Sequence, residues 1–483
     1  MHGGTTMISD IPPFRLAGNI YFVGTYEASS HLIDTGDGLI LIDTGYERTA
    51  DAVLDSMQIL GFDIDDVKYI LHSHGHGDHT FATPKLLKLC RAKTALHRAD
   101  LRYVRAKFTP DIFLHDGDVI KLGNTEILCL ETPGHTEGTI SFFLDVTEGG
   151  KTYHAGMFGG AGTPQQKKKF LKERGLSYLQ RGKFFKSIER LRGIPVDIFV
   201  GNHSWNNDTK GNYEKSLTSD TNPFIDPTRW CAFLDTCEKK LLDIIHEESR
   251  TEFVNYAHRG ASEYYPENTM SSFDAGLEMG ANGIETDVQI TKDGIPVLFH
   301  DDTLTRVTGQ DGAIADYTYE ELLAFDVKKG DRTDKIMKFE DFLARYGERD
   351  ITFAIELKRR GAAEAVVNLV RQYGVEKKCV ITSFLFNEAA AVREYAPHMT
   401  VGYLTSTVND ELIARMLECG IDELCPKASL VTADAVEAWH RLGFNVRAWG
   451  VTDEAIMRTV YDAGADGMTV NFPDKLTAYI EQK

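Results

Sequence analysis

The octapeptide His72-Ser-His-Gly-His-Gly-Asp-His79 follows directly after an apolar run at residues 67–71. That run is typical of a buried strand, so the octapeptide lies in the loop at the end of the strand. Imidazole and carboxylate side chains together suit zinc and related ions. The loop offers four such side chains within six positions, namely His74, His76, Asp78 and His79. We therefore predict a metal-binding loop at this point of the chain.

Two more histidines stand in the same kind of position. His135 follows an apolar run at 127–130, and His203 follows another at 196–200. Asp43 ends a further run at 39–42. Loops at strand ends carry functional side chains that a rigid scaffold positions. We therefore expect these residues to join the octapeptide in one site.

This ordered set resembles the metallo-β-lactamase fold superfamily, whose His-x-His-x-Asp-His signature is met in full from His74 to His79. The resemblance implies an αββα sandwich that binds two zinc ions. It also implies the ligands: His74, His76 and His135 for one ion, and Asp78, His79 and His203 for the other. Asp78 would orient a hydroxide that the two ions generate from water near neutral pH. Asp43 matches the family's supporting aspartate.

One position departs from many members of this superfamily. In Tyr153-His-Ala-Gly-Met-Phe158, Met157 stands where they have a metal-bridging aspartate, and a thioether cannot supply that anionic bridge. The trihistidine subclass of the β-lactamases also lacks this ligand and has a stretch like Asn222-Pro-Phe-Ile-Asp-Pro227. The resemblance is therefore closest to that subclass. It leaves the substrate open, because relatives cleave lactams, lactones, thioesters and phosphodiesters.

A second pattern covers residues 251–483. Strand-like runs alternate there with helical stretches, which predicts a (β/α)8 TIM barrel. The run at 296–299 follows the second barrel strand too closely for a crossover helix, so we expect a hairpin that brings His300 beside Glu285 and Asp287. The sequence thus predicts two domains, an αββα sandwich at 1–250 and a TIM barrel at 251–483.

Polar motifs lie at the ends of the predicted barrel strands. His258 and Arg259 end the first strand, and Glu285-Thr-Asp287 places two carboxylates on one side of the second. Glu356-Leu-Lys358 ends a later strand. Carboxylate oxygens suit Ca²⁺ or Mg²⁺, and TIM-barrel enzymes carry catalysis at the carboxyl ends of their strands. We therefore expect a second active site in the barrel.

These motifs resemble the glycerophosphodiester phosphodiesterase family over essentially all of 251–483. Further matches are Pro266-Glu-Asn-Thr269, Thr291-Lys-Asp-Gly294 and Ser383-Phe384, whereas Thr469-Val-Asn-Phe-Pro473 departs from the usual Thr-Asp-x-Pro. The resemblance implies hydrolysis of a glycerophosphodiester to sn-glycerol 3-phosphate and an alcohol, with one Ca²⁺ or Mg²⁺ bound. It also implies residue roles: Glu285, Asp287 and Glu356 as metal ligands, His258 and His300 as general acid and base, Arg259 and Lys358 as phosphate ligands, and Glu267 and Trp449 as residues lining the site.

Composition limits the partners and the compartment. The net charge of −19 over 483 residues disfavours nucleic acid, and no 18-residue apolar run could span a bilayer. Seven scattered cysteines and an N-terminus, residues 1–10, without secretory features predict a cytoplasmic protein. The run Lys167-Lys168-Lys169, in a helix predicted over 165–192, is expected to be a solvated face. The expected partner is a small phosphodiester, and an oligomer is compatible with the sequence.

Three functions fit these motifs. The first is a bifunctional metallohydrolase, whose barrel cleaves glycerophosphodiesters and whose dizinc domain cleaves an unidentified ester, lactone, amide or phosphodiester. In the second, a β-lactamase or lactonase activity is the main function and the barrel is a phospho-ligand-binding or sensor module. In the third, one domain is a non-enzymatic scaffold. We expect the first, with the two steps acting in succession on one substrate.

Overall fold

The computed structural model describes residues 11–483. Residues 1–10, on which the prediction of no secretory signal depends, lie outside the described part. The chain divides into two compact units, Met1–Gln166 with Lys183–Leu242, and Lys167–Gly182 with Asp243–Lys483. The chain therefore crosses from the first unit to the second for the last time within helix α7 (Thr228–Thr251), between Leu242 and Asp243. The predicted domain limits at 250 and 251 stay a prediction.

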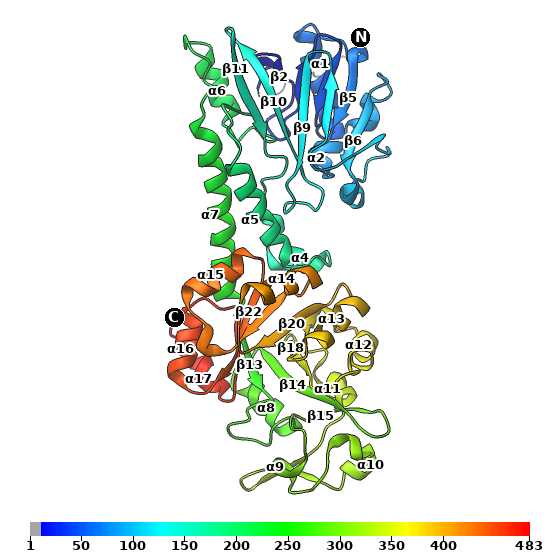
Figure 1. Ribbon diagram of the computed structural model, residues 1–483, viewed down its shortest axis with the longest axis vertical. Helices are drawn as coiled ribbons and strands as arrows, with labels where there is room; N and C mark the ends of the chain where they lie inside the picture. Colours follow the sequence, from blue (N-terminus) through cyan, green and yellow to red (C-terminus); the bar gives the residue numbers. More distant parts are fainter. Residues whose placement is uncertain (1–10) are drawn as a thin grey trace, which may run out of the picture. The chain divides into compact units, whose positions relative to one another are not determined.

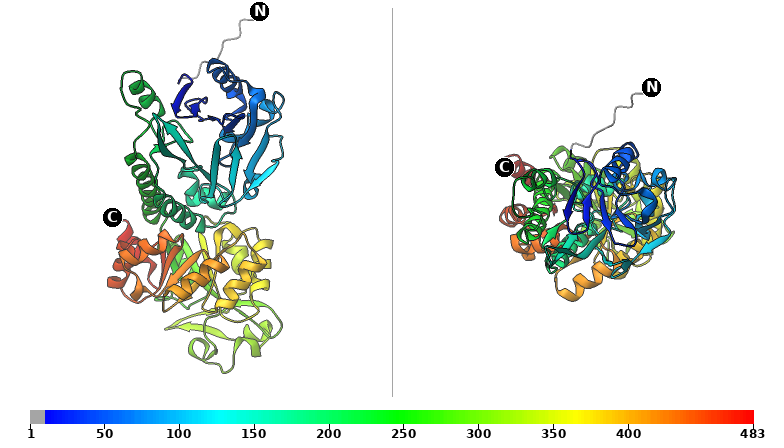
Figure 2. Two further views of the ribbon diagram at one scale, coloured as in Figure 1. Left: turned by 45° about the horizontal axis from the view of Figure 1, so that its top comes forward. Right: turned by 90° about the horizontal axis from the view of Figure 1, so that it is seen from above.

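Within the described residues, the first unit has two sheets (Figures 1 and 2). The first sheet runs β1 to β7 in chain order: β1 (Phe14–Ala17), β2 (Ile20–Phe22), β3 (His31–Asp34), β4 (Leu39–Ile42), β5 (Val67–Leu71), β6 (Lys93–His97) and β7 (Ile112–Leu114). The second has the order β12-β11-β10-β9-β8: β8 (Val119–Leu122), β9 (Thr125–Glu131), β10 (Ile140–Glu148), β11 (Lys151–Met157) and β12 (Ile198–Phe199). This architecture confirms the predicted sandwich.

Strand β4 explains why the first sheet is apolar on both faces. Ile40 and Ile42 belong to the core between the two sheets, whereas Leu39 and Leu41 pack with Val53 of α1 (Ala50–Ile59) on the other face. Successive side chains of a strand point to opposite faces, so a continuous apolar run fits a sheet covered on both sides.

Helices α5 (Leu179–Arg192) and α7 cover the outer face of the second sheet, as Figure 2 shows. Trp230 of α7 packs edge-on against Phe143 and Phe199 of that sheet. Its indole Nε1 donates a hydrogen bond to the backbone oxygen of Leu191 in α5. The remaining helices of this part of the chain are short: α2 (Gly77–Thr80), α3 (Thr83–Leu86) and α6 (Thr209–Ser216).

The second unit is a closed barrel of parallel strands, which confirms the predicted TIM barrel. Strand β13 pairs with both β14 and β23 and so closes the sheet. Within the described residues the barrel strands are β13 (Val254–His258), β14 (Gly283–Ile290), β18 (Thr352–Leu357), β19 (Cys379–Ser383), β20 (Thr400–Thr405), β21 (Glu423–Pro426), β22 (Asn445–Val451) and β23 (Gly467–Val470). The predicted hairpin is confirmed as well, because β15 (Pro296–Leu298) runs antiparallel to β14, with Val288 opposite Leu298.

Helices follow most of the barrel strands (Figure 1). They are α8 (Met270–Glu278), α9 (Thr305–Thr308), α10 (Tyr319–Leu322), α11 (Phe339–Tyr346), α12 (Ala363–Gln372), α13 (Phe386–Tyr395), α14 (Asp410–Cys419), α15 (Ala433–Arg441), α16 (Glu454–Asp462) and α17 (Pro473–Ile480). A hairpin of β16 (Asp326–Lys329) and β17 (Arg332–Lys335) lies between α10 and α11 in the chain. None of the helices in residues 11–483 is long and apolar enough to cross a bilayer.

In and around the segment Lys167–Gly182 the structure differs from two expectations, the extent of a helix and the exposure of a lysine. In place of one helix over 165–192, α4 (Lys168–Glu173) and α5 are separate. Lys167 and Lys169 are exposed as expected, but Lys168 is buried, and its Nζ pairs at 2.7 Å with Asp466, which also accepts a hydrogen bond from His440. An ammonium group tolerates such burial only beside a carboxylate.

Two candidate metal centres

Asp43 organises the metal-binding loop of the first unit. It stands directly after β4 with a left-handed φ of 57°, and its carboxylate accepts hydrogen bonds from Ser73 N at 2.8 Å and Ser73 Oγ at 2.7 Å. The same carboxylate binds His79 Nδ1 at 2.7 Å. Asp43 therefore fixes the start of the loop and the orientation of one predicted ligand, which is the supporting role that the sequence assigns to it.

Backbone oxygens orient three other predicted ligands. The Nδ1 atoms of His74, His135 and His203 lie 2.9 Å from the backbone oxygens of Gly159, Gly162 and Glu27, respectively. A carbonyl oxygen can only accept, so each Nδ1 carries the proton and donates it. Each Nε2 then keeps a free lone pair, as metal-ligating imidazoles do.

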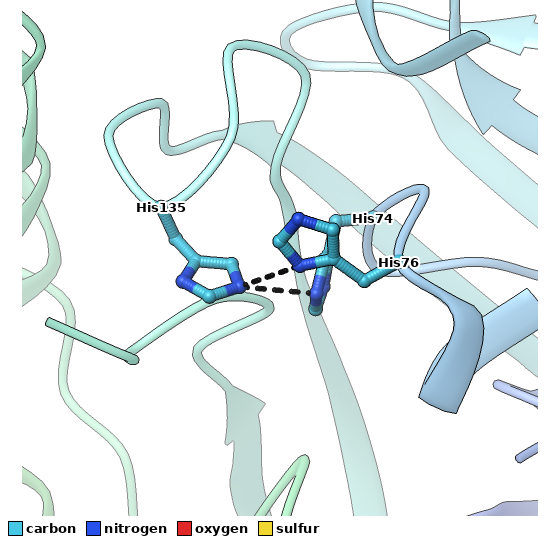
Figure 3. Close-up of side chains that lie close together, drawn as sticks. All are labelled: His74, His76 and His135. Carbon is cyan, nitrogen blue, oxygen red and sulfur yellow. Dashed lines mark hydrogen bonds between the residues drawn. The ribbon is translucent and has the colours of Figure 1, made fainter. Parts of the chain in front are cut away.

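One ring nitrogen each from His74, His76 and His135 converges on a common point (Figure 3). His135 Nε2 lies 3.1 Å from His76 Nδ1 and 3.2 Å from His74 Nε2. Two unprotonated Nε2 atoms would repel each other at this distance. Ligands about 2.05 Å from a tetrahedral zinc ion are about 3.3 Å apart. The three nitrogens therefore fit a single zinc ion.

The other three predicted ligands lie beside this group. His79 Nε2 is buried without a hydrogen-bond partner in the described structure and lies 3.4 Å from Asp78 Oδ2. The same Asp78 oxygen lies 3.7 Å from His203 Nε2. All six predicted ligands of the first unit are thus brought together, with His74, His76 and His135 in one group and Asp78 beside both His79 and His203.

Burial and neighbouring charges shift the pKa values of four of these ligands, His74, His79, His135 and His203. Burial lowers the pKa of His135 and of His203 to about 4, and burial followed by the neighbouring imidazoles lowers the pKa of His74 well below its usual value. These rings are neutral at pH 7, which is the form that binds metal. Burial opposes a charge on His79, but Asp43 and Asp78 outweigh it and raise the pKa of His79 to about 10. The two carboxylates therefore hold a proton on His79, which a metal ion bound there would displace.

The second unit brings three predicted carboxylates together on two neighbouring barrel strands, β14 and β18. Asp287 of β14 is paired in register with Glu356 of β18, and Glu285 lies two residues before Asp287. Their oxygens lie within 4.8 Å of one another, and all three residues are buried. Burial, followed by Asp287 and Glu356, raises the pKa of Glu285 well above its usual value, while burial and then Asp287 raise the pKa of Glu356 to about 7. A hard divalent cation would relieve this repulsion.

Two basic side chains border these carboxylates. Arg259, held at a left-handed φ of 55°, places its Nε 3.2 Å from Asp287 and donates from Nη1 to Glu267 at 2.9 Å. Lys358 Nζ donates to Glu356 at 2.7 Å and lies 3.7 Å from Asp287. Both cations are therefore beside the predicted metal ligands, where a phosphate bound to the metal would meet them.

The two barrel histidines have different partners. His258 Nδ1 lies 2.6 Å from the side-chain oxygen of Asn471, and its Nε2 lies 3.9 Å from Glu285. His300 Nδ1 lies 2.7 Å from the carboxylate of Asp301. In both rings Nδ1 is thus within hydrogen-bond distance of a neighbouring side chain, and Nε2 is the nitrogen that can exchange a proton with a substrate.

Trp449 stands apart from this charged group. Its indole Nε1 donates to the backbone oxygen of Thr405 at 3.1 Å, and its ring packs edge-on against Phe384 with 4.8 Å between centroids. Lys358 Nζ lies 5.9 Å from the centre of the Phe384 ring. The structure therefore connects Trp449 to the other predicted residues through Phe384.

Several residues that sequence reasoning missed complete the barrel site. Asn471 lies in the stretch that departs from the family pattern, and it occupies the Nδ1 side of His258. Asn268 donates to Asp287 at 2.9 Å. Asp301 and Arg306 flank His300 and Glu267. Asn268 stands inside the quoted stretch Pro266–Thr269 and Asp301 directly follows His300, so both could have been proposed, whereas Arg306 lies outside the motifs quoted from the sequence.

Comparisons with known proteins match each half of the chain separately. Residues 258–475 match the family model described as the glycerophosphoryl diester phosphodiesterase family, and residues 23–148 match the metallo-beta-lactamase superfamily. The chain is therefore a fusion of two such domains, as the motifs predicted.

Relatives of the second half are similar over nearly their whole length. A glycerophosphodiester phosphodiesterase of Caldanaerobacter subterraneus is 31% identical over 229 residues, which cover 46% of this chain and 94% of the relative. An uncharacterized Bacillus subtilis protein, YqiK, is 34% identical over 242 residues, 47% of this chain and 98% of the relative.

Among solved structures, native FEZ-1 metallo-beta-lactamase from Legionella gormanii is 28% identical with a TM-score of 0.44, covering 50% of this chain and 98% of that one.

Proposed function

Because the chain belongs, through its second half, to the glycerophosphodiester phosphodiesterase family, we propose that its barrel hydrolyses a glycerophosphodiester to sn-glycerol 3-phosphate and an alcohol. The cluster of Glu285, Asp287 and Glu356 beside Arg259 and Lys358 carries this proposal. A phosphodiester is anionic, so its binding among buried carboxylates needs a cation and basic side chains.

The roles of the barrel residues follow from their positions. A Ca²⁺ or Mg²⁺ ion held by the three carboxylates would neutralise the phosphate charge. Arg259 and Lys358 bind the phosphate oxygens, and Glu267 holds Arg259 in place. His258 and His300 exchange protons through Nε2, because their Nδ1 atoms are engaged. One takes the proton of the substrate's glycerol hydroxyl as it attacks phosphorus, and the other gives a proton to the leaving alcohol. Water then opens the resulting cyclic phosphate to sn-glycerol 3-phosphate.

The first unit is a metallo-β-lactamase-fold domain, for which we propose two zinc ions and a hydrolytic reaction. His74, His76 and His135 would hold one ion, and Asp78, His79 and His203 the other. The ions would supply a hydroxide at neutral pH, and Asp78 would orient it. The class of bond stays open among esters, lactones, amides and phosphodiesters. We propose that this step precedes or follows the barrel step on one substrate; activities on wholly unrelated compounds would remove that idea.

The barrel function is tested by assaying release of sn-glycerol 3-phosphate from glycerophosphocholine and glycerophosphoethanolamine with added Mg²⁺ or Ca²⁺. The proposal expects release that requires the divalent ion. A folded protein with bound metal that releases none from these or other glycerophosphodiesters would contradict the proposal and favour a phospho-ligand-binding barrel.

A second candidate function rests on the six metal ligands of the first unit. If β-lactamase or lactonase activity is the main function, the chain should hydrolyse nitrocefin or a lactone, and His74→Ala should remove that activity. Absence of turnover with either compound, in protein with a full zinc content, would exclude these two substrates.

A further inference from the structure

Arg306 links two carboxylates of the barrel site. It lies in the short helix α9, and its guanidinium donates to both oxygens of Glu267, at 2.8 and 2.6 Å. The same group donates to both oxygens of Asp301, at 2.5 and 2.9 Å. One guanidinium thus makes two bidentate contacts, which is the strongest way that this group binds carboxylates.

Each of these carboxylates also holds a residue with a proposed role. Glu267 Oε1 accepts from Arg259 Nη1 at 2.9 Å, and Asp301 Oδ1 lies 2.7 Å from His300 Nδ1. Arg306 is therefore the middle member of a continuous chain of charged contacts. The chain runs from the proposed phosphate-binding Arg259 to the proposed proton-transfer residue His300.

The place of Arg306 is also one that a metal ion could fill. Ligand atoms of Glu267, His300 and Asp301 lie within 4.8 Å of one another, and a histidine with two carboxylates is a donor set for a divalent transition metal. The guanidinium already binds the two carboxylates. Two carboxylates this close require a positive partner, and here the chain itself provides one.

We propose that Arg306 is a positioning residue that takes the place of a second cation in the barrel, and so holds Arg259 and His300 in a fixed relation. The roles of Arg259 and His300 rest on the proposed function. A guanidinium keeps its charge at any working pH, and its planar fork fixes both carboxylates. Unlike a metal ion, however, it cannot coordinate and activate a water molecule. The barrel site would therefore hold a single metal ion, at Glu285, Asp287 and Glu356.

Arg306 suits a direct test because its side chain is 51% exposed, so its removal leaves the apolar core unchanged. Arg306→Met removes the charge, and Arg306→Lys restores the charge without the fork. The matched control is Arg345→Met. Arg345 also pairs through two nitrogens with one carboxylate, that of Asp274, and it belongs to no proposed site.

The proposal expects kcat for glycerophosphodiester cleavage to fall about 10- to 100-fold in Arg306→Met, with Arg306→Lys between that variant and the wild type. Because His300 loses its partner's support, the loss should lie in kcat more than in KM. After equilibration with Mn²⁺, Arg306→Met should bind about one more metal ion per chain than the wild type or Arg345→Met. Elemental analysis measures this difference.

A kcat in Arg306→Met equal to that of Arg345→Met, or an unchanged metal content, would overturn the proposal. If the wild type cleaves no glycerophosphodiester, the proposed function fails by itself, and the metal count alone decides: an additional ion supports the cation role of Arg306, and equal contents refute it. Should Arg306→Met lose its fold by circular dichroism, the same two outcomes are read from Arg306→Gln.

Discussion

The two metal centres of this chain solve different electrostatic problems. In the first unit most ligands are imidazoles, and backbone oxygens at Gly159, Gly162 and Glu27 fix their orientation. In the barrel the ligands are three buried carboxylates whose mutual repulsion is opposed by Arg259 and Lys358. Orientation of imidazole rings thus prepares one site, and balance of charge prepares the other. Variants should therefore affect the two sites independently and by different means.

The largest expected effect is that of Asp287→Asn. This change removes a charge that faces the metal position, Arg259 and Lys358 together. We expect glycerophosphodiester cleavage to fall by about 10³- to 10⁴-fold, because metal and phosphate binding are both lost. The zinc content of the first unit should not change. A loss of zinc in this variant would contradict the independence of the two sites.

His74→Ala is the corresponding change in the first unit. It removes one of the two nitrogens that lie within 3.2 Å of His135 Nε2. Zinc affinity and any zinc-dependent hydrolysis should fall by about 10²-fold or more. Elemental analysis and an assay with a zinc-dependent substrate measure the two effects. Retention of the full zinc content after dialysis would show that His74 is not a ligand.

Asn471→Leu should have a smaller effect, confined to the barrel. The substitution removes the oxygen that holds His258 Nδ1 and leaves the metal ligands unchanged. We expect kcat to fall about 10- to 100-fold with little change in metal affinity, as for residues that orient a functional group. Asn471→Asp keeps an acceptor and should retain more activity than Asn471→Leu. Equal activities in the two variants would contradict a positioning role.

Acid should weaken metal binding in the barrel before it weakens binding of the zinc ion expected at His74, His76 and His135. The pKa of Glu356 is raised to about 7, so below that pH a proton must leave before a metal binds, and affinity should fall by about tenfold at pH 6. His135, with its pKa lowered to about 4, and His74, whose pKa is lowered well below its usual value, stay unprotonated there. Calorimetric titrations of Mg²⁺ and Zn²⁺ at pH 8 and pH 6 check the order. Zinc lost first would contradict it.

The sequence predicted what local patterns determine. Both folds follow from the spacing of apolar runs, and His74, His76, Asp78 and His79 lie within six positions, so their convergence needs no knowledge of tertiary contacts. The hairpin before His300 was also predictable, because the segment between its strands is too short for a helix.

The missed features depend on pairs that are distant in sequence or lack a motif. Lys168 resembles any surface lysine until Asp466, 298 residues later, is seen beside it. Asn471 reads as a departure from a motif, and its importance appears only when it meets His258, 213 residues earlier. Arg306 gains its place by contacting two carboxylates that the fold brings to one point.

The barrel is proposed to cleave glycerophosphodiesters with its own residues. The most direct measurement is release of sn-glycerol 3-phosphate from glycerophosphocholine by the wild type, His258→Ala and His74→Ala, side by side at pH 8 with Mg²⁺. The account predicts release by the wild type and by His74→Ala, and loss of release in His258→Ala. Release that survives His258→Ala but is lost in His74→Ala would assign the cleavage to the first unit and contradict the account.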